Sequence, residues 1–159
     1  MPPPPGPTAR RAGPADAAVV LRLVREIAAA EGEVSDVRSD ERTWAAALAR
    51  PDVLVLLAER DGEAVGYVSA VRRLHLWLGT DVLALDDLFV RDGHRDAGVG
   101  RFLMNELARL ATAEDLLVRW EVREDNTAAQ RFYRRLGAGL RTKVVVRWPP
   151  AAQRAFLGD

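Results

Sequence analysis

The sequence predicts a single α/β domain built around a mixed sheet. Two observations lead to this class. First, short apolar or alternating runs typical of strands alternate along the chain with stretches of helical periodicity. Second, Gly, Pro and Asp-Gly signals, which are typical of turns, separate these stretches. The expected order is one strand, two helices, three strands, a helix, a strand, a helix and a last strand. No internal repeat occurs, and 159 residues suffice for one domain with a buried core.

The expected domain spans residues 8–159 and follows a proline-rich tail, residues 1–7, whose composition favours disorder. Within the domain, Asp61-Gly62 supplies the positive φ angles that a two-residue hairpin turn needs. Residues 72–80, RRLHLWLGT, fit either the end of a strand or a loop. The expected strands are residues 8–12, 52–60, 63–71, 81–90, 116–122 and 142–148.

The expected helices begin and end at recognisable signals. Asp16 precedes the first periodic run and Gly32 ends it, Pro51 stops the second helix, and Gly137 ends the last. These helices are residues 16–31, 41–50, 98–113 and 127–137. The third is the most regular, and its apolar face consists of Val99, Phe102, Leu103, Leu107, Leu110 and Ala111.

Composition excludes several classes of function. The 23 basic and 23 acidic residues cancel, so the basic excess of a general nucleic-acid binder is missing and we expect no nucleic-acid partner. The chain has no cysteine and only His75 and His94, so we expect neither thiol chemistry nor a metal site. The N-terminus lacks the apolar core of a secretion signal, and no apolar run reaches the length of a membrane span. We therefore expect a cytoplasmic protein without a membrane partner.

The stretch RDAGVG, residues 95–100, lies between an expected strand and an expected helix. Glycines let an anion approach the backbone closely, and the first helical turn offers unpaired N–H groups at the positive end of the helix dipole. A dinucleotide fold would need a third glycine after Gly100, and a nucleoside-triphosphate loop would need Gly-Lys-Ser or Gly-Lys-Thr. Neither is present. Taken alone, the stretch fits an ordinary strand-to-helix turn or a phosphate cradle.

The residues around this stretch make the pattern specific. LDDLFVRDGHRDAGVGRFLMNELARLA, residues 85–111, resembles the acetyl-CoA-binding motif of the GNAT N-acetyltransferase superfamily, where a strand leads through a turn to R-x-x-G-x-G and a helix. EDNTAAQRFYRRLGA, residues 124–138, is similar to the second motif of that family, N-x-x-A-x-x-F-Y-x-x-x-G. The resemblance covers nearly the whole chain after Thr8. It implies the acyl-CoA N-acyltransferase fold: α/β, with a mixed, mostly antiparallel central sheet flanked by four helices and splayed at the cofactor cleft.

Within the superfamily, the chain most resembles the diamine or polyamine (spermidine/spermine) N-acetyltransferase branch. That branch carries leucine, an acidic residue, aspartate and then apolar residues ending in valine before the loop, and residues 85–90, LDDLFV, match. Two features depart from the branch. Asp86 is shorter than the glutamate common there, and residues 142–148 lack the expected tryptophan-arginine pattern.

The resemblance implies a binding mode for acetyl-CoA, the expected co-substrate. The pyrophosphate would sit on the N–H groups of residues 96–101, with Gly98 and Gly100 giving it room. The backbone of residues 88–90 would pair with the pantetheine amides like an added strand, so the neighbouring strands must separate there. Asn126 either caps its helix only or also touches the cofactor. The expected cofactor-binding residues are Leu88, Phe89, Val90, Arg95, Asp96, Ala97, Gly98, Val99, Gly100, Arg101 and Asn126.

The implied reaction is acetyl transfer to a primary amine. Such an amine has a pKa of about 10.4, so it is protonated at neutral pH and the enzyme must remove a proton. The resemblance places the Tyr133 hydroxyl near the sulfur as general acid, and Asp86 or Glu31 would relay the amine proton through water. Glu33 and Asp36 are further carboxylates, which fit either a cation site or a solvated surface. The expected acceptor-binding residues are Glu31, Asp86, Asp87 and Trp77.

The leading interpretation is an acetyl-CoA-dependent N-acetyltransferase for a diamine, a polyamine or a lysine-like amine. Inside the superfamily, the alternatives are an aminoglycoside, a protein lysine or a protein N-terminus as acceptor. An alternative of another class is a non-catalytic acyl-CoA-binding sensor, although a pure binder has no need for a phenol such as Tyr133 at the sulfur. The resemblance also implies a homodimer, and the exposed last strand would suit pairing across its interface.

Overall fold

The computed structural model of the chain describes residues 6–158. Residues up to Trp120 form one compact unit, and residues from Glu121 onward form a second. Residues 1–5, which make up most of the expected tail, lie outside the described residues. In the described part of the chain, no helix is both long and apolar enough to span a membrane.

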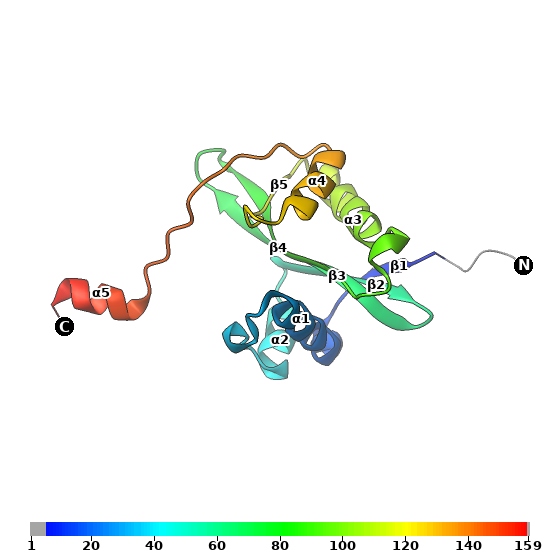
Figure 1. The fold of residues 1–159 in the computed structure, drawn as a ribbon, viewed down its shortest axis with the longest axis horizontal. Helices are drawn as coiled ribbons and strands as arrows, with labels where there is room; N and C mark the ends of the chain where they lie inside the picture. Colours follow the sequence, from blue (N-terminus) through cyan, green and yellow to red (C-terminus); the bar gives the residue numbers. More distant parts are fainter. Residues whose placement is uncertain (1–5, 159) are drawn as a thin grey trace, which may run out of the picture. The chain divides into compact units, whose positions relative to one another are not determined.

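The first unit is built on a five-stranded sheet in the order β1-β2-β3-β4-β5. The first four strands are antiparallel to their neighbours, and β5 pairs with β4 in parallel (Figure 1). The mixed, mostly antiparallel sheet expected from the sequence is therefore confirmed. Its strands are β1 (Thr8–Arg11), β2 (Val53–Arg60), β3 (Glu63–His75), β4 (Thr80–Val90) and β5 (Leu117–Arg119).

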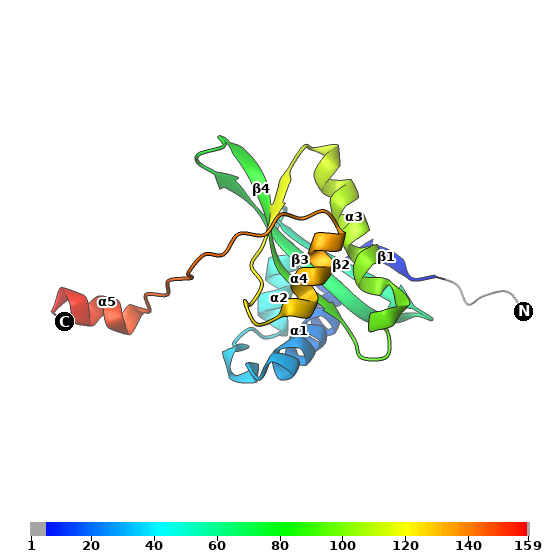
Figure 2. The ribbon, with the colours of Figure 1, turned by 45° about the horizontal axis from the view of Figure 1, so that its top comes forward.

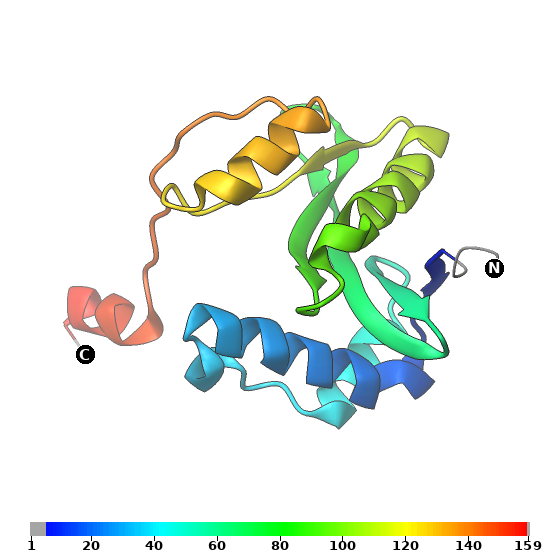
Figure 3. The same cartoon turned by 45° about the vertical axis from the view of Figure 1, so that its right-hand side comes forward.

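Helices cover both faces of this sheet. α1 (Ala17–Glu31) and α2 (Glu41–Leu48) lie on one face and α3 (Val99–Ala113) on the other (Figures 1 and 3). Three short 3-10 helices, η1 (Pro14–Asp16), η2 (Val34–Asp36) and η3 (Arg95–Ala97), lie in the connections. The core beneath α1 and α2 contains Val20, Leu23, Val55, Leu57, Tyr67 and Phe89. The buried residues of α3 are Val99, Leu103, Met104, Leu107 and Ala111, whereas Leu110, expected on the same face, is exposed.

Local signals in the sequence explain where these elements end. Asp61 and Gly62 have φ angles of 53° and 81°, as the predicted hairpin turn between β2 and β3 requires. Gly32 ends α1 with a φ of 75°. At the start of α2, the Asp40 carboxylate accepts a hydrogen bond from the Thr43 amide at 2.7 Å, which caps the helix. These turns and caps were predictable because each depends on adjacent residues only.

The second unit contains α4 (Thr127–Arg135) and α5 (Pro150–Leu157). The predicted α4 is present, and the Asn126 side chain accepts a hydrogen bond from the Ala129 amide at 3.0 Å, so its capping role is confirmed. Helix α5 was not predicted. Pro150 at its first position and Gly158 after its end are ordinary helix signals. The sequence analysis instead took Pro149 and Pro150 as the end of a strand at residues 142–148.

The predicted last strand at residues 142–148 is wrong, because these residues have no regular secondary structure. Val144 and Val146 are 89% and 84% exposed. Three β-branched valines in a row favour a strand locally, but a strand also needs a neighbour for its backbone groups. Within the described residues, the sheet ends at β5 and pairs no strand with this segment.

Candidate active site

Strand β4 carries a bulge at Asp86, the first of its two adjacent aspartates. In the register with β3, Asp87 lies opposite Ser69 and Leu85 lies opposite Ala70, so Asp86 is the extra residue between the two pairs. A bulge of this kind bends its strand and re-aims the side chains beside it. The irregularity expected from the paired aspartates is thus present, and it lies in the middle of the candidate site.

Strand β4 also extends beyond the reach of β5. The parallel pairing joins Val82–Ala84 to Leu117–Arg119 only, whereas β4 continues to Val90. Among the described strands, residues 85–90 are paired on the β3 side alone. Their other edge therefore presents backbone N–H and C=O groups that an extended, amide-bearing ligand can pair with. Residues 88–90, predicted to bind the pantetheine, lie in this segment.

A glycine in β3 brings the two strands close together at this point. Gly66 lies opposite Val90, and a Cβ built on Gly66 would stand 2.6 Å from the carbonyl oxygen of Phe89. No real Cβ tolerates such a distance to backbone, so only glycine permits the observed position of β4. The path of the open edge therefore depends on a residue in the neighbouring strand.

The turn after β4 leads into α3 through Gly98, which has a φ of 75° and no atom within 4 Å of its would-be Cβ. Val99, Gly100 and Arg101 follow as the first turn of α3, whose N–H groups precede the internal hydrogen bonds of a helix. The Phe102 amide begins those bonds by donating to the Gly98 carbonyl at 2.9 Å. Backbone amides at a helix N-terminus beside an open glycine turn suit a phosphate group.

Arg95 attaches this turn to the end of the strand. Its Nε donates to the Val90 carbonyl at 3.1 Å and lies 3.2 Å from an Asp92 carboxylate oxygen. Arg95, Asp96 and Ala97 form η3, directly before Gly98. The side chain of Asp96 lies outside what the structure describes.

On the face of the sheet toward α1, Asp87 contacts a buried tyrosine that the sequence analysis did not identify. The Tyr67 hydroxyl donates to the Asp87 carboxylate at 3.0 Å, and the Asp87 amide donates to the Ser69 hydroxyl at 3.2 Å. Tyr67 is fully buried in the core beneath α1 and α2. Its hydroxyl meets Asp87 only because the register sets Tyr67 opposite Phe89, two residues beyond Asp87.

Burial shifts the pKa values of this group upward. Burial raises the pKa of Asp87, and the Tyr67 and Ser69 hydroxyls only partly oppose it. Partial burial, followed by the neighbouring charge of Asp87, raises the pKa of Asp86. Burial and the charges of Asp87, Glu31 and Asp86 all raise the pKa of Tyr67, which remains protonated. A carboxylate with a raised pKa is a better proton acceptor than a surface aspartate.

Asp87 also lines an acidic pocket of about 380 Å³ between β4, the end of α1 and the following connection. The pocket contains four carboxylates and one guanidinium, that of Arg38. Apolar side chains of α1 form another part of its wall. The structure thus brings together Glu31, Glu33, Asp36 and Asp87, four of the five carboxylates that the sequence suggested for holding a cation. Asp86 is next to the pocket in sequence but does not line it.

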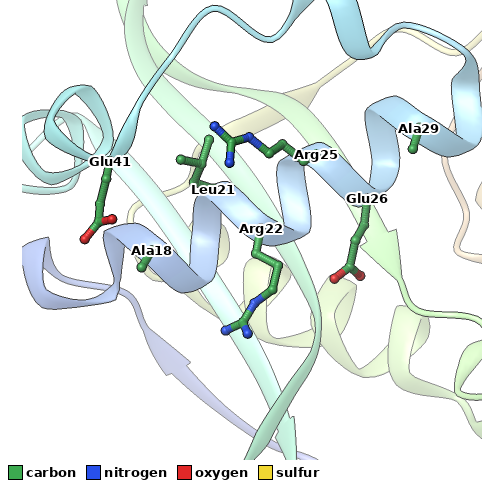
Figure 4. Close-up of a pocket in the computed structure, with 7 residues that line it drawn as sticks. All are labelled: Ala18, Leu21, Arg22, Arg25, Glu26, Ala29 and Glu41. Carbon is green, nitrogen blue, oxygen red and sulfur yellow. The ribbon is translucent and has the colours of Figure 1, made fainter.

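A second hollow, of about 450 Å³, runs along the outer side of α1 and is lined by Ala18, Leu21, Arg22, Arg25, Glu26, Ala29 and Glu41. Figure 4 shows Arg22 and Glu26 extending to the same side of the helix and Arg25 to the other. Two arginines balance two glutamates here, and no residue of the two motifs, residues 85–111 and 124–138, takes part. The acidic pocket is therefore the better candidate for a cationic acceptor.

Trp77 does not line the acidic pocket, and its role in binding the acceptor stays a prediction. Trp77 lies in the turn between β3 and β4 and is 96% exposed. Figure 2 shows that β3 and β4 form a hairpin that extends beyond the rest of the sheet. Asp87 follows Thr80, which is beside the tip of that hairpin, by seven positions along β4, a span of about 23 Å. Trp77 of the same chain therefore cannot line the pocket that contains Asp87. The alternatives for residues 72–80 are also settled, because β3 continues to His75 and a turn follows.

Two predicted site residues belong to the second unit. Tyr133 lies on α4 and is buried, and its ring packs against Phe132 with 5.4 Å between ring centroids. Asn126 caps the same helix. The role of Tyr133 as general acid and a contact between Asn126 and the cofactor remain predictions.

Solved structures with the same fold include two kinds of acetyltransferase. An aminoglycoside acetyltransferase from an uncultured soil metagenomic sample is 20% identical over 92% of this chain and 99% of its own, with a TM-score of 0.76. Another soil metagenomic aminoglycoside acetyltransferase, in complex with sisomicin, is 17% identical over 90% of this chain and 95% of its own, with a TM-score of 0.78. The ribosomal-protein-alanine N-acetyltransferase of Brucella melitensis biovar Abortus 2308 is 20% identical over 91% of this chain and 100% of its own, with a TM-score of 0.74.

These likenesses confirm the predicted fold, and their low identities carry no further conclusion about the acceptor. No curated protein sequence matches the chain. The family model described as "Acetyltransferase (GNAT) family" matches residues 21–138, a range that includes the acidic pocket, the open edge of β4, the glycine turn and α4. The chain therefore belongs to the GNAT family of acetyltransferases.

Proposed function

We propose that the protein transfers the acetyl group of acetyl-CoA to a primary amine on a small cation, with diamines, polyamines and lysine-like amines as the first class of acceptor. The acidic pocket is the observation that carries this proposal, since its carboxylates outnumber its single guanidinium by four to one. Clustered carboxylates attract and orient a cation that bears more than one amine. The membership of the chain in the GNAT family supplies the reaction class.

The first unit has features that fit acetyl-CoA, the co-substrate of this family. The unpaired edge of β4 at residues 88–90 suits the pantetheine amides. The amides of Val99, Gly100 and Arg101, after the open turn at Gly98, suit the pyrophosphate, with Arg95 nearby as a positive charge. Acetyl-CoA supplies the thioester carbonyl that the amine attacks.

Asp87 is the proposed acceptor of the amine proton, and Asp86 and Glu31 are the alternatives that the sequence favoured. Three facts support Asp87. It lines the acidic pocket, it lies on the strand with the open edge, and its pKa is raised by burial. The Tyr67 hydroxyl fixes one carboxylate oxygen by donating to it at 3.0 Å. Glu31, Glu33 and Asp36 would hold the acceptor's other ammonium groups.

Tyr133 is the proposed proton donor to the departing thiolate, as the family resemblance implies. Tyr133 is buried, and its phenol carries a proton that can pass to a thiolate formed beside it. The proposal includes a contact between Asn126 and the cofactor in addition to its capping bond.

An aminoglycoside is the second candidate acceptor. Aminoglycosides also carry several amines, and two of the structurally similar proteins are aminoglycoside acetyltransferases, one of them in complex with sisomicin. An acidic pocket serves both classes, so the discrimination between them depends on size. A flexible diamine fills about 380 Å³ more completely than a multi-ring aminoglycoside, most of which would lie outside.

A thiol-release assay with acetyl-CoA tests the proposal directly. Diamines, polyamines, thialysine, aminoglycosides and peptides are compared at equal concentration, with acetyl-CoA alone as the background. We expect the highest kcat/KM with a diamine or polyamine. Turnover with aminoglycosides only would establish the second candidate. Saturable coenzyme A binding without turnover of any amine would instead indicate a sensor.

A homodimer in the cytoplasm is the proposed state of the protein. Large apolar side chains of the second unit are exposed in the single chain, among them Val144, Val146, Phe156 and Leu157. Exposed apolar groups of this kind favour association. Light scattering after size-exclusion chromatography should give twice the chain mass of 17.5 kDa.

A further inference from the structure

One ion pair joins the helix that carries the acidic pocket to the loop that carries the glycine turn. The Arg91 guanidinium donates to both carboxylate oxygens of Glu26, from Nε at 2.8 Å and from Nη2 at 2.7 Å. Its Nη1 also donates to the Ala64 carbonyl at 2.9 Å, and its amide donates to the Val65 carbonyl at 2.9 Å. Arg91 is thus held by α1 and by β3 at the same time.

The two partners belong to different parts of the site. Arg91 is the first residue after β4, where the loop toward Gly98 begins. Glu26 lies on α1, and Glu31 of the acidic pocket follows five residues later, about 7.5 Å along the helix axis. Val24, Ile27 and Ala28, around Glu26 in sequence, line that pocket. A shift of Glu26 relative to Arg91 would therefore change the distance between the acidic pocket and the loop that leads to Gly98.

The geometry suits a rigid connection. A bidentate arginine–carboxylate pair fixes both the separation and the orientation of its partners, unlike a single contact. The side chains of Arg91 and Glu26 are only 26% and 34% exposed, so water screens the pair less than a surface pair. Figure 4 shows Glu26 projecting from the side of α1.

We propose that Glu26 and Arg91 are positioning residues that set the distance between the acceptor pocket and the acetyl-CoA loop. This inference rests on the proposed function of the two regions. Neither residue contacts a reacting atom, and the pair acts through the carboxylates of α1 and the amides beyond Gly98. Attack on a carbonyl is sensitive to misplacement of the amine by as little as 1 Å, so loosening this connection lowers the rate.

The test compares Glu26→Gln and Arg91→Lys with a matched control, Asp16→Asn. Arg10 also makes a bidentate pair with Asp16, at 2.9 and 2.7 Å, but that pair joins β1 to η1. We expect Glu26→Gln and Arg91→Lys to lower kcat/KM for the amine roughly tenfold through misalignment. The double variant should be no worse than the worse single variant, because both changes break one connection. Asp16→Asn should lower the melting temperature at least as much and leave kcat/KM within about twofold.

Two readouts are independent of turnover. In the protein without ligand, amide hydrogen exchange at residues 91–98 should become faster in Glu26→Gln and stay unchanged in Asp16→Asn. Calorimetry should show weaker binding of coenzyme A, by roughly threefold to tenfold, in Glu26→Gln only. If Glu26→Gln shows the same amide hydrogen exchange and the same affinity for coenzyme A as Asp16→Asn, the positioning role is wrong. If the wild-type protein acetylates no amine, the proposed function fails, and these two readouts still decide whether the pair organises the loop.

Discussion

At the residue scale, Asp87 is placed where its charge costs stability. It lies on a central strand beside a bulge, and burial raises its pKa despite hydrogen bonds from neighbouring groups. A chain selected for stability alone would place an uncharged residue there. The retention of a carboxylate at this position is easier to explain by chemistry than by packing.

Asp87→Asn should separate function from stability. Asparagine keeps the size and still accepts the Tyr67 hydrogen bond, but it takes no proton. We expect kcat/KM to fall by about 10²-fold, as for loss of a general base. At neutral pH the melting temperature should rise, because the variant no longer buries a charge. Scanning calorimetry and steady-state kinetics on the same sample check both parts, with Asp115→Asn, at an exposed carboxylate outside the pocket, as the control. A fall in stability with intact activity would contradict this assignment.

The pH dependence of stability follows from the same shift. The folded protein binds the Asp87 proton more tightly than the unfolded chain, whose carboxyl titrates near the ordinary value of 3.8. The contribution of Asp87 to the free energy of unfolding therefore falls as the pH rises from about that value through the raised folded-state pKa. The difference in melting temperature between Asp87→Asn and wild type should accordingly vanish at the acid end of this window and grow above it.

Tyr67→Phe should move the acid limb of the pH–rate profile. The Tyr67 hydroxyl lowers the pKa of Asp87 by donating to the carboxylate, so its removal raises that pKa further. Protonated Asp87 accepts no proton, so activity should begin to fall at a higher pH than in wild type. Loss of the buried hydrogen bond should also cost about 1–3 kcal/mol of stability. An unchanged acid limb in kcat/KM would show that another group, such as Glu31, sets it.

At the element scale, β4 combines a bulge, an open edge and a glycine-dependent approach to β3. The open edge arises because β5 is only three residues long, and the position of that edge depends on Gly66. The strand can therefore bind a ligand because β5 leaves part of its edge unpaired and because Gly66 has no side chain beside it. Substitutions in β3 should affect a ligand that β3 never touches.

Gly66→Ala should weaken coenzyme A binding without removing any ligand contact. Its methyl group would meet the Phe89 carbonyl at 2.6 Å, so β4 must shift along the segment proposed to pair with pantetheine. We expect a loss of stability of about 1–3 kcal/mol, typical of overpacking, and a rise in the dissociation constant of roughly tenfold. Gly13→Ala is the control, because it has nothing within 4 Å and a φ of −116°. Calorimetric titration with coenzyme A should show wild-type affinity for that variant only.

These elements also show which features the sequence could reveal. Helices α1 to α4, the Asp61-Gly62 turn and the strands up to Val90 follow from periodicity and adjacent signals. The paired aspartates indicated an irregular strand, but the choice of Asp86 as the extra residue depends on the register with β3. Tyr67 looked like one more apolar strand residue, and only that register brings its hydroxyl to Asp87. The valines at residues 144–146 predicted a strand that the structure does not contain, because strand propensity alone does not supply a partner strand.

At the scale of the whole molecule, the proposed chemistry divides between the two compact units. The residues proposed to receive the amine and bind the pyrophosphate belong to the unit that ends at Trp120. The proposed general acid, Tyr133, belongs to the unit that begins at Glu121. If both assignments hold, a variant of the second unit should abolish turnover and leave the binding steps of the first intact.

Tyr133→Phe tests this division. Phenylalanine keeps the ring and its packing on Phe132, at a centroid distance of 5.4 Å in the wild type, and removes only the hydroxyl. We expect kcat to fall by about 10²-fold or more between about pH 6 and 9, because the departing thiolate loses its proton donor. The dissociation constant of coenzyme A, measured by calorimetry, should change by less than about threefold, because no charge or backbone amide is lost. An acetyl donor with a better leaving group, such as an activated acetyl thioester used in place of acetyl-CoA, should restore most of the rate, because its thiolate departs without a proton donor. Turnover unaffected by the substitution across this range would assign the proton donor elsewhere, and loss of coenzyme A binding would make Tyr133 a binding residue instead.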